Sequence, residues 1–295
     1  MAFAHNGDVE IYYETFGDRE RPALLLVNGL GSQCINYRVE WCERFVAARY
    51  FVIRYDNRDV GLSTKFGDEM PDVAAVAHSV AAGDRAEVPY MLSEMASDGL
   101  AVLDDLGIER AHVMGVSMGG MIVQTMAIEH PARLLTMTSV MSTTGDPDVG
   151  QATEEARRLL LTPPVSDRDG YIAGTLAGLR IWGSPACFDE ERLVANAGEA
   201  FDRSNFASGR VRQLIAVMAS GSRTEALRNV NVPTLVMHGS ADTLIDSSGG
   251  RRTAEVIPGA SFELLEGMGH DYPPQYWEQI VDLVTAHAAQ VPAEP

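Results

Sequence analysis

The stretch Gly115-Val116-Ser117-Met118-Gly119 sets a serine between two glycines, in the spacing G-x-S-x-G. An apolar run at residues 111–114 precedes it, and a helical pattern at residues 119–130 follows it. A strand, a sharp turn and a helix in this order hold the central residue in strained backbone geometry, and the flanking glycines let neighbouring backbone pass close by. We therefore predict that the Ser117 hydroxyl lies exposed at the carboxyl end of a strand, near unpaired N–H groups at the start of a helix.

Further apolar runs, each bounded by turn residues, occur along the rest of the chain. A short continuous apolar run is typical of a strand that is covered on both faces, as in a parallel sheet. The predicted strands are residues 8–17 (a strand or a hairpin), 23–27, 51–55, 112–114, 135–140, 234–237 and 262–265.

Helical patterns lie between these runs. The clearest begins at Ser93, which we predict as its N-cap, and ends at Gly107. Residues 121–130 and 276–288 form two more. Strands that alternate with helices over the whole length predict an α/β fold, with a mostly parallel, twisted sheet flanked by helices.

One long stretch interrupts the alternation of strands and helices. Residues 146–228 contain helical patterns cut short by prolines and glycines, but no run that reads as a core strand. An insertion without a sheet of its own predicts a helical cap rather than a separate α/β domain. We therefore expect a core made of residues 1–145 and 229–295, with a cap at residues 146–228 inserted between two strands of the sheet.

The composition limits the partners and the compartment. The 295 residues include 41 acidic and 23 basic side chains, for a formal net charge of −18, so nucleic acid and anionic membranes are poor partners. No run is long and apolar enough to span a membrane, and residues 1–10 lack the pattern of a secretory signal. Cys34, Cys42 and Cys187 show neither metal-ligand spacing nor a disulfide framework, which predicts a cytoplasmic location. The sequence leaves the oligomeric state open.

A serine needs a base that accepts its proton, and His270 is the best candidate among seven histidines. It follows the last predicted strand, in a loop from which its side chain can reach back over the edge of the sheet. The other histidines show no partner pattern and no metal-ligand spacing, so we predict structural roles for them and neither a metal nor a cofactor for the chain. These six are His5, His78, His112, His130, His238 and His287.

The base in turn needs a carboxylate that orients it, and we predict that this is Asp242. It lies in the turn after the predicted strand at residues 234–237, whereas the base follows the next strand. Asp246 and Asp271 are the alternatives, and both are more simply explained as solvated or helix-capping carboxylates.

Backbone N–H groups complete the expected site. The N–H of Met118, directly after Ser117, is one predicted donor to a negatively charged oxygen that forms during attack on a carbonyl group. The loop at residues 27–32 contains two glycines that allow a tight turn, and we predict the N–H of Leu30 as the second donor.

These features together resemble the α/β-hydrolase superfamily. Residues 56–63 (DNRDVGLS) resemble its D-x-R-G-x-G-x-S turn, and Gly269-His270 resembles its base turn. His238-Gly239 followed by Asp242 resembles the H-G-x-x-D turn that carries the acid. Within the superfamily, residues 27–32, 54–64 and 139–146 look most similar to a group of bacterial carboxylesterases. The N-terminal hairpin, the turn at Ser117 and the last turns are similar to those of the aclacinomycin methylesterases, which hydrolyse polyketide esters. The chain departs from the wider pattern at Asn28, where histidine is common, and at Asp246, where proline is common.

The resemblance implies a cofactor-free serine esterase that acts on carboxylic esters of small to medium size. A serine at this turn excludes the branches that use aspartate as the nucleophile, namely the haloalkane dehalogenases and epoxide hydrolases. A thioesterase, an acyltransferase or a carbon–carbon bond hydrolase would use the same three side chains, and a non-enzymatic ligand sensor is a further alternative. An apolar cap would line the substrate pocket, and for each of its aromatic candidates packing within the cap is the alternative to substrate contact. These candidates are Trp182, Phe188, Phe201 and Phe206.

Overall fold

The strand β3 (Ala23–Val27) shows how the core of the protein is divided. All of its residues are buried, and successive side chains point to opposite faces of the sheet. Leu24 and Leu26 belong to the apolar cluster on one face. Leu25 and Val27 belong to the cluster on the other face. A continuous apolar sequence thus fills both halves of the core, as expected of a doubly covered strand.

The sheet is mostly parallel, as predicted. The computed structural model describes residues 2–163 and 165–291, and in these residues eight strands form one sheet in the order β1-β2-β4-β3-β5-β6-β7-β8. The first two pairings, β1 with β2 and β2 with β4, are antiparallel, and the others are parallel. The other strands are β1 (Ala2–Asn6), β2 (Val9–Phe16), β4 (Phe51–Tyr55), β5 (Ala111–Val116), β6 (Leu134–Val140), β7 (Thr234–Gly239) and β8 (Ser261–Leu265).

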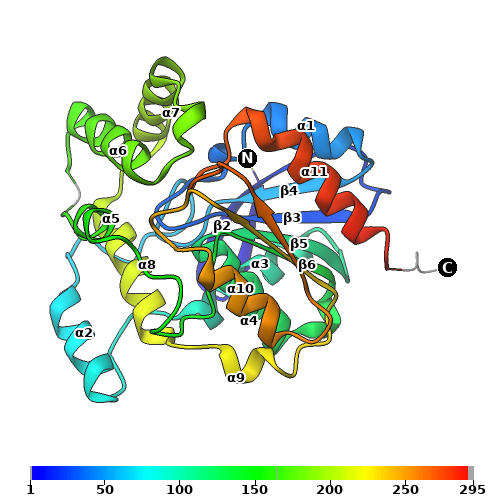
Figure 1. The fold of residues 1–295 in the computed structure, drawn as a ribbon, viewed down its shortest axis with the longest axis horizontal. Coiled ribbons are helices and arrows are strands. Elements are labelled where there is room, and N and C mark those ends of the chain that lie inside the picture. The colour runs from blue at the N-terminus through cyan, green and yellow to red at the C-terminus, as the bar shows by residue number, and fades with distance from the viewer. Residues whose placement is uncertain (1, 164, 292–295) are drawn as a thin grey trace.

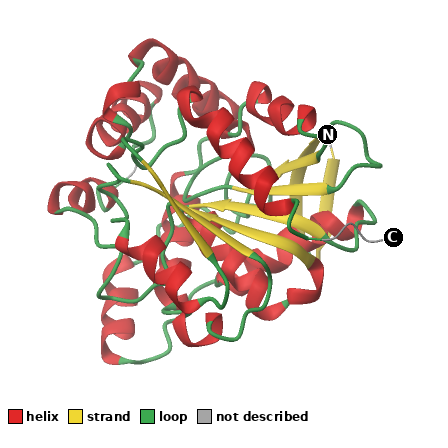
Figure 2. Ribbon diagram, turned by 45° about the vertical axis from the view of Figure 1, so that its right-hand side comes forward, coloured by secondary structure: helices red, strands yellow, loops and turns green. Residues whose placement is uncertain are grey.

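Helices cover both faces of this sheet. The helices α3 (Leu92–Asp105), α4 (Met118–Glu129) and α10 (Ser248–Val256) pack on one face. The helices α1 (Val39–Ala47) and α11 (Pro274–Ala288) pack on the other, and Figure 1 shows these two lying side by side. Figure 2 shows the strands as one twisted fan between the helices. Short 3₁₀ helices occur at η1 (Cys34–Asn36), η2 (Pro131–Arg133) and η3 (Pro185–Cys187).

Residues 146–228, which we call the helical segment, lie in the chain between β6 and β7. These two strands are neighbours in the sheet, and the described residues of the segment contain no strand. Figure 1 shows its first four helices gathered beyond one end of the strands, with α2 (Val73–Ala82) beside α8. The helices are α5 (Glu154–Leu160), α6 (Arg168–Trp182), α7 (Glu190–Arg203), α8 (Ala207–Ser220) and α9 (Thr224–Leu227). The division into a core and a cap stays a prediction, and residues 1, 164 and 292–295 of those ranges lie outside the described residues.

Two local predictions were wrong. The helix α3 begins one residue before Ser93, and its N-cap is Met91, whose backbone N–H donates to the Glu94 carboxylate at 2.7 Å. Ser93 donates instead to the Glu129 side chain. The strand β8 is not covered on both faces, since Leu265 is its one buried residue and Leu264 is exposed. It is also the edge strand of the sheet. No helix among the described residues has the length and apolar character to cross a bilayer.

Candidate active site

The sharp turn at Ser117 connects β5 to α4. Ser117 has φ 57° and ψ −119°, a conformation that a non-glycine residue rarely adopts. A Cβ on Gly115 would lie 2.0 Å from the carbonyl oxygen of Gly119, and one on Gly119 would lie 2.1 Å from that of Val27. Both positions therefore need glycine, because the helix starts directly against the strand. The turn leaves the Ser117 side chain at the carboxyl end of β5, as predicted from the sequence.

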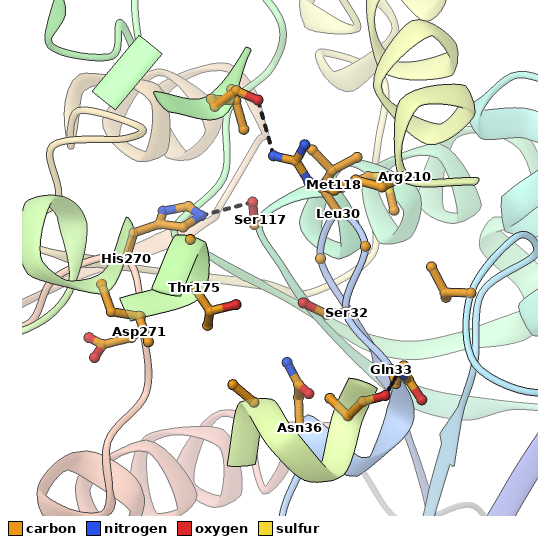
Figure 3. A pocket seen from close by; sticks show the side chains of 18 of the residues that line it. Leu30, Ser32, Gln33, Asn36, Ser117, Met118, Thr175, Arg210, His270 and Asp271 are labelled. Atoms are coloured by element: carbon orange, nitrogen blue, oxygen red, sulfur yellow. Dashed lines mark hydrogen bonds between the residues drawn. The ribbon is translucent and has the colours of Figure 1, made fainter. Parts of the chain in front are cut away.

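His270 lies between Ser117 and Asp242 and bonds to both side chains. Its Nε2 is 2.9 Å from the Ser117 Oγ, and its Nδ1 is 2.7 Å from the Asp242 Oδ2. An ionised carboxylate only accepts hydrogen bonds, so Nδ1 carries the ring proton and the Nε2 lone pair faces the serine hydroxyl. The structure thus brings together three side chains that are 28 and 153 residues apart in the sequence. Figure 3 shows the His270 ring directed at Ser117.

Asp242 is buried and held by more groups than the sequence indicated. Its Oδ1 accepts the backbone N–H groups of Leu244 and Ile245, both at 2.9 Å. Burial alone would raise the pKa of Asp242, but the electrostatic interaction with the His270 ring and the N–H groups that His238 and His270 direct at the carboxylate lower that pKa well below its ordinary value. Asp242 is therefore a carboxylate throughout the neutral pH range.

His238 touches the acid, a role that the sequence analysis missed. Its Nε2 lies 2.8 Å from the carbonyl oxygen of Ile245, so this nitrogen carries the proton, and 3.4 Å from the Asp242 Oδ2. The two alternative acids have other partners. Asp246 accepts the backbone N–H of Ser248 at 3.0 Å near the start of α10, and Asp271 accepts hydrogen bonds from the backbone and the hydroxyl of Ser184.

The two predicted backbone donors lie beside Ser117. A Cβ on Gly29 would lie 3.2 Å from the Ser117 Cβ and 3.7 Å from its Oγ, so the loop that carries Leu30 packs directly against the serine. Met118 is the first residue of α4, where N–H groups have no partner within the helix. Within the described chain, neither the Leu30 nor the Met118 N–H donates a hydrogen bond. Figure 3 shows both residues on the same side of Ser117, away from His270.

A pocket of about 580 Å³ opens over Ser117 and His270. It is lined by the loop at residues 29–33, by the turns after β5 and β8, and by residues from α5 to α8. Of the four predicted aromatic residues, Trp182 and Phe206 line it. Phe188 and Phe201 are not among its lining residues, because Phe188 packs on Arg180 and Phe201 on Tyr171. In residues 2–163 and 165–291, no cluster of three histidine, cysteine or acidic side chains could hold a metal ion.

The sequence comparisons agree with this geometry. A model of the alpha/beta hydrolase fold matches residues 22–178. The chain belongs to the α/β-hydrolase family. Rhodomycin D methylesterase of Streptomyces peucetius is 32% identical to it, in an alignment that covers 96% of each chain. The similarity to the methylesterases that was predicted from the motifs is therefore confirmed.

Two further α/β-hydrolases are similar over nearly the whole length. The 3-oxoadipate enol-lactonase 2 of Acinetobacter baylyi is 26% identical, over 94% of this chain and 93% of that protein. The solved structure of the enol-lactonase from Burkholderia xenovorans superposes with a TM-score of 0.74, over 98% of this chain and 100% of that one. Its sequence is 21% identical, so this likeness shows the fold alone.

The turn at residues 56–63 lies beside the pocket. Its first residue, Asp56, does not line the pocket, whereas Asp59 does. Asp56 is buried and accepts the backbone N–H groups of Cys34 at 2.7 Å and Leu62 at 2.8 Å. Asp59 has φ 71° and is bonded to Arg212 of α8. The turn thus joins the loop near Ser117, through the hydrogen bond from the Asn57 side chain to the carbonyl oxygen of Asn28, to the helical segment.

Two residues of α8 that contact the loop at residues 29–33 escaped the sequence analysis. The Gln213 Oε1 accepts the N–H of Gly31 at 2.8 Å, and its Nε2 donates to the carbonyl oxygen of Arg58 at 2.8 Å. Arg210 lines the pocket. No motif marks either residue, because their placement depends on how α8 packs against loops about 150 or more residues earlier in the chain.

Proposed function

We propose that the protein is a serine esterase in which Ser117 is the nucleophile, His270 the base and Asp242 the orienting acid. The observation that carries the proposal is the continuous hydrogen-bonded series from the Ser117 Oγ through His270 to Asp242, at 2.9 and 2.7 Å, at the floor of a pocket. Its geometry fits nucleophilic attack on a carbonyl carbon, because the base and its orienting group are both within hydrogen-bond distance.

The reaction proceeds in two halves. The Ser117 Oγ attacks the ester carbonyl while the His270 Nε2 takes its proton, and the bond to the alcohol breaks as His270 returns that proton to the leaving oxygen. Water then attacks the acyl-serine with His270 again as base, which releases the acid and regenerates Ser117. The N–H groups of Leu30 and Met118 bind the oxyanion in both halves.

The substrate class follows from the pocket and from the relatives. A volume of about 580 Å³ accommodates an ester of small to medium size. The most similar relatives named above are a methylesterase and an enol-lactonase, which both cleave carboxylic esters. In this proposal residues 146–228 act as a cap over the pocket, and the reaction needs neither a metal nor a cofactor. The cytoplasm stays the proposed location, a view that the free thiols of Cys34, Cys42 and Cys187 support.

The test is hydrolysis of 4-nitrophenyl esters, from acetate to dodecanoate, by the wild type and by Ser117→Ala. We expect turnover by the wild type and a loss of kcat/KM of about 10⁴-fold or more in the variant. Absence of turnover on every chain length by the folded wild type would contradict the esterase proposal and would favour acyl transfer, carbon–carbon bond cleavage or ligand sensing. Equal turnover by Ser117→Ala would exclude Ser117 as the nucleophile.

A further inference from the structure

We propose that Arg210 binds an anionic group of the substrate, so that the ester cleaved at Ser117 carries a free carboxylate. This inference rests on the proposed esterase function and narrows its substrate class. Arg210 belongs to α8 and lines the pocket together with Ser117 and His270. A Cβ on Gly31 would lie 3.1 Å from the Arg210 Cγ, so this side chain passes directly over the loop that carries Leu30. Figure 3 shows it on the side of Leu30 and Met118.

Arg210 makes few contacts for a cation in this position. Its one hydrogen bond within the described chain runs from Nη2 to the carbonyl oxygen of Leu160, at 3.1 Å. No aspartate or glutamate of residues 2–163 and 165–291 forms an ion pair with it. A guanidinium group has five N–H donors, and a carboxylate can engage two of them side by side. The donors of Nε and Nη1 are therefore free to bind a ligand.

The other charged side chains around the pocket have partners of their own. Arg38 pairs with Glu199 at 2.6 Å, and Arg192 lies 3.5 Å from Asp189. Asp59 pairs with Arg212 at 2.9 Å. Asp271 is bonded to Ser184. Among the arginines that line the described pocket, Arg210 thus differs in two ways. No neighbouring carboxylate offsets its charge, and no side chain accepts a hydrogen bond from its N–H groups.

The energetics favour an anion at this position. Burial lowers the pKa of Arg210, but an arginine remains charged at neutral pH. A partly desolvated cation without a counter-ion is costly, and a bound carboxylate offsets that cost. The formal net charge of −18 does not attract anions to the molecule as a whole. An anionic substrate must therefore be recognised locally, and Arg210 supplies a local positive charge in the pocket that also contains Ser117.

The experiment compares two esters of the same chain length, 4-nitrophenyl hexanoate and the mono-4-nitrophenyl ester of adipic acid, which differ in a terminal carboxylate. The ratio of kcat/KM for the adipate ester to that for the hexanoate ester is measured for the wild type, Arg210→Met and Arg210→Lys. Arg180→Met serves as the control, because Arg180 belongs to the same helical segment but pairs with Glu190 at an exposed position.

We expect Arg210→Met to lower this ratio by about 10- to 100-fold, the usual effect of a lost charge-assisted hydrogen bond. Arg210→Lys should restore part of it, and Arg180→Met should leave it unchanged. A ratio in Arg210→Met within twofold of the wild type would overturn the proposal and would mean that Arg210 only joins α8 to α5 through Leu160.

Binding of adipate itself separates this inference from the esterase proposal. Calorimetry with Ser117→Ala should show adipate binding that the double variant Ser117→Ala/Arg210→Met has lost. Such binding without hydrolysis of either ester by the wild type would contradict the esterase proposal but still show that Arg210 binds an anionic group. Ester hydrolysis together with adipate binding that does not depend on Arg210 would contradict this inference and leave the esterase proposal standing.

Inhibition of the wild type tests the proposal without any substitution, so it holds even if Arg210→Met does not fold. Adipate should inhibit hexanoate ester hydrolysis by the wild type at a concentration about tenfold or more below that of the neutral 1,6-hexanediol. Equal inhibition by the two compounds would overturn the proposal.

Discussion

The turns after β5, β7 and β8 and the helical segment (residues 146–228) line the same pocket, but different interactions hold them in place. In the turns the contacts are local and involve the backbone: Asp242 accepts the N–H groups of residues two and three positions ahead. In the helical segment they are buried ion pairs between distant residues. Arg203 pairs with Asp56 at 2.7 Å and Arg212 with Asp59 at 2.9 Å, across 147 and 153 residues.

This difference assigns different tasks to the two regions. Short hydrogen bonds within a turn fix reacting atoms to a fraction of an ångström, which is what acid–base catalysis needs. A few ion pairs that hold helices over a pocket fix its shape but leave its lining open to change. We therefore expect substitutions in the turns to affect the rate of the chemistry, and substitutions in the helical segment to affect stability and choice of substrate.

The largest effect is expected from Asp242→Asn, which should lower kcat by about 10³- to 10⁴-fold because His270 loses the carboxylate that sets its tautomer. The ester assay measures this directly. Asp246→Asn is the matched control in the same turn, since Asp246 bonds to the start of α10 rather than to His270. Equal losses in the two variants would contradict the role given to Asp242.

The next effect tests the attachment of the helical segment. Arg212 and Asp59 are both almost completely buried, so Arg212→Met leaves the Asp59 carboxylate in the interior without its counter-ion. We expect the free energy of unfolding in urea to fall by about 3–5 kcal/mol. The pair between Arg228 and Glu225 is exposed, and Arg228→Met should cause no measurable change. A similar stability of the two variants would mean that buried ion pairs do not hold the segment.

The pH dependence of stability tests a buried histidine of the sheet. His112 of β5 is buried, with its Nδ1 2.8 Å from the Thr136 Oγ1, and burial, followed by the charge of His287, lowers its pKa to about 4. In the unfolded chain His112 has its ordinary pKa of 6.5, and in the folded chain it binds a proton only near pH 4. The contribution of neutral His112 to the free energy of unfolding is therefore fully present above pH 6.5. It decreases as the pH falls toward 4, by about 3 kcal/mol in all.

Urea unfolding of the wild type and His112→Asn between pH 7 and pH 4.5 measures this contribution. The wild type should lose more stability than the variant over this range. A pH slope in His112→Asn as steep as in the wild type would show that His112 is protonated equally in both states.

The smallest effect concerns the aromatic residues of the helical segment. Trp182 lines the pocket, whereas Phe201 packs against Tyr171 at a ring distance of 5.6 Å. Trp182→Ala should lower kcat/KM for the octanoate ester by about tenfold relative to the acetate ester, because apolar contact with the acyl chain is lost. Phe201→Ala should leave that ratio unchanged. The opposite result would exchange the roles of the two residues.

The same contrast explains what could be predicted from the sequence. Ser117 follows β5 directly, and Asp242 and His270 lie in the turns after β7 and β8. The end of a strand can be read from the apolar run and the glycines that bound it. The residues of the helical segment that line the pocket could not be predicted in this way. Arg210 and Arg212 are two residues apart on α8, yet one faces the pocket and the other bonds to Asp59. Only the packing of α8 against residues far away in the sequence distinguishes them.

The two errors in the fold have different causes, one local and one that depends on the whole sheet. A serine in the first turn of a helix is a common N-cap, but the Glu94 carboxylate bonds to the N–H of Met91 and the helix starts earlier. The apolar sequence of β8 does not reveal that this strand is the last in the sheet.

The central claim is that Ser117 is the nucleophile and that His270 activates it. Its most direct test is covalent labelling of the intact protein with a fluorophosphonate, followed by mass spectrometry of its peptides. We predict one label per chain, on Ser117, absent from Ser117→Ala and formed far more slowly in His270→Gln. Labelling of another residue, or labelling of Ser117→Ala at the wild-type rate, would contradict the account.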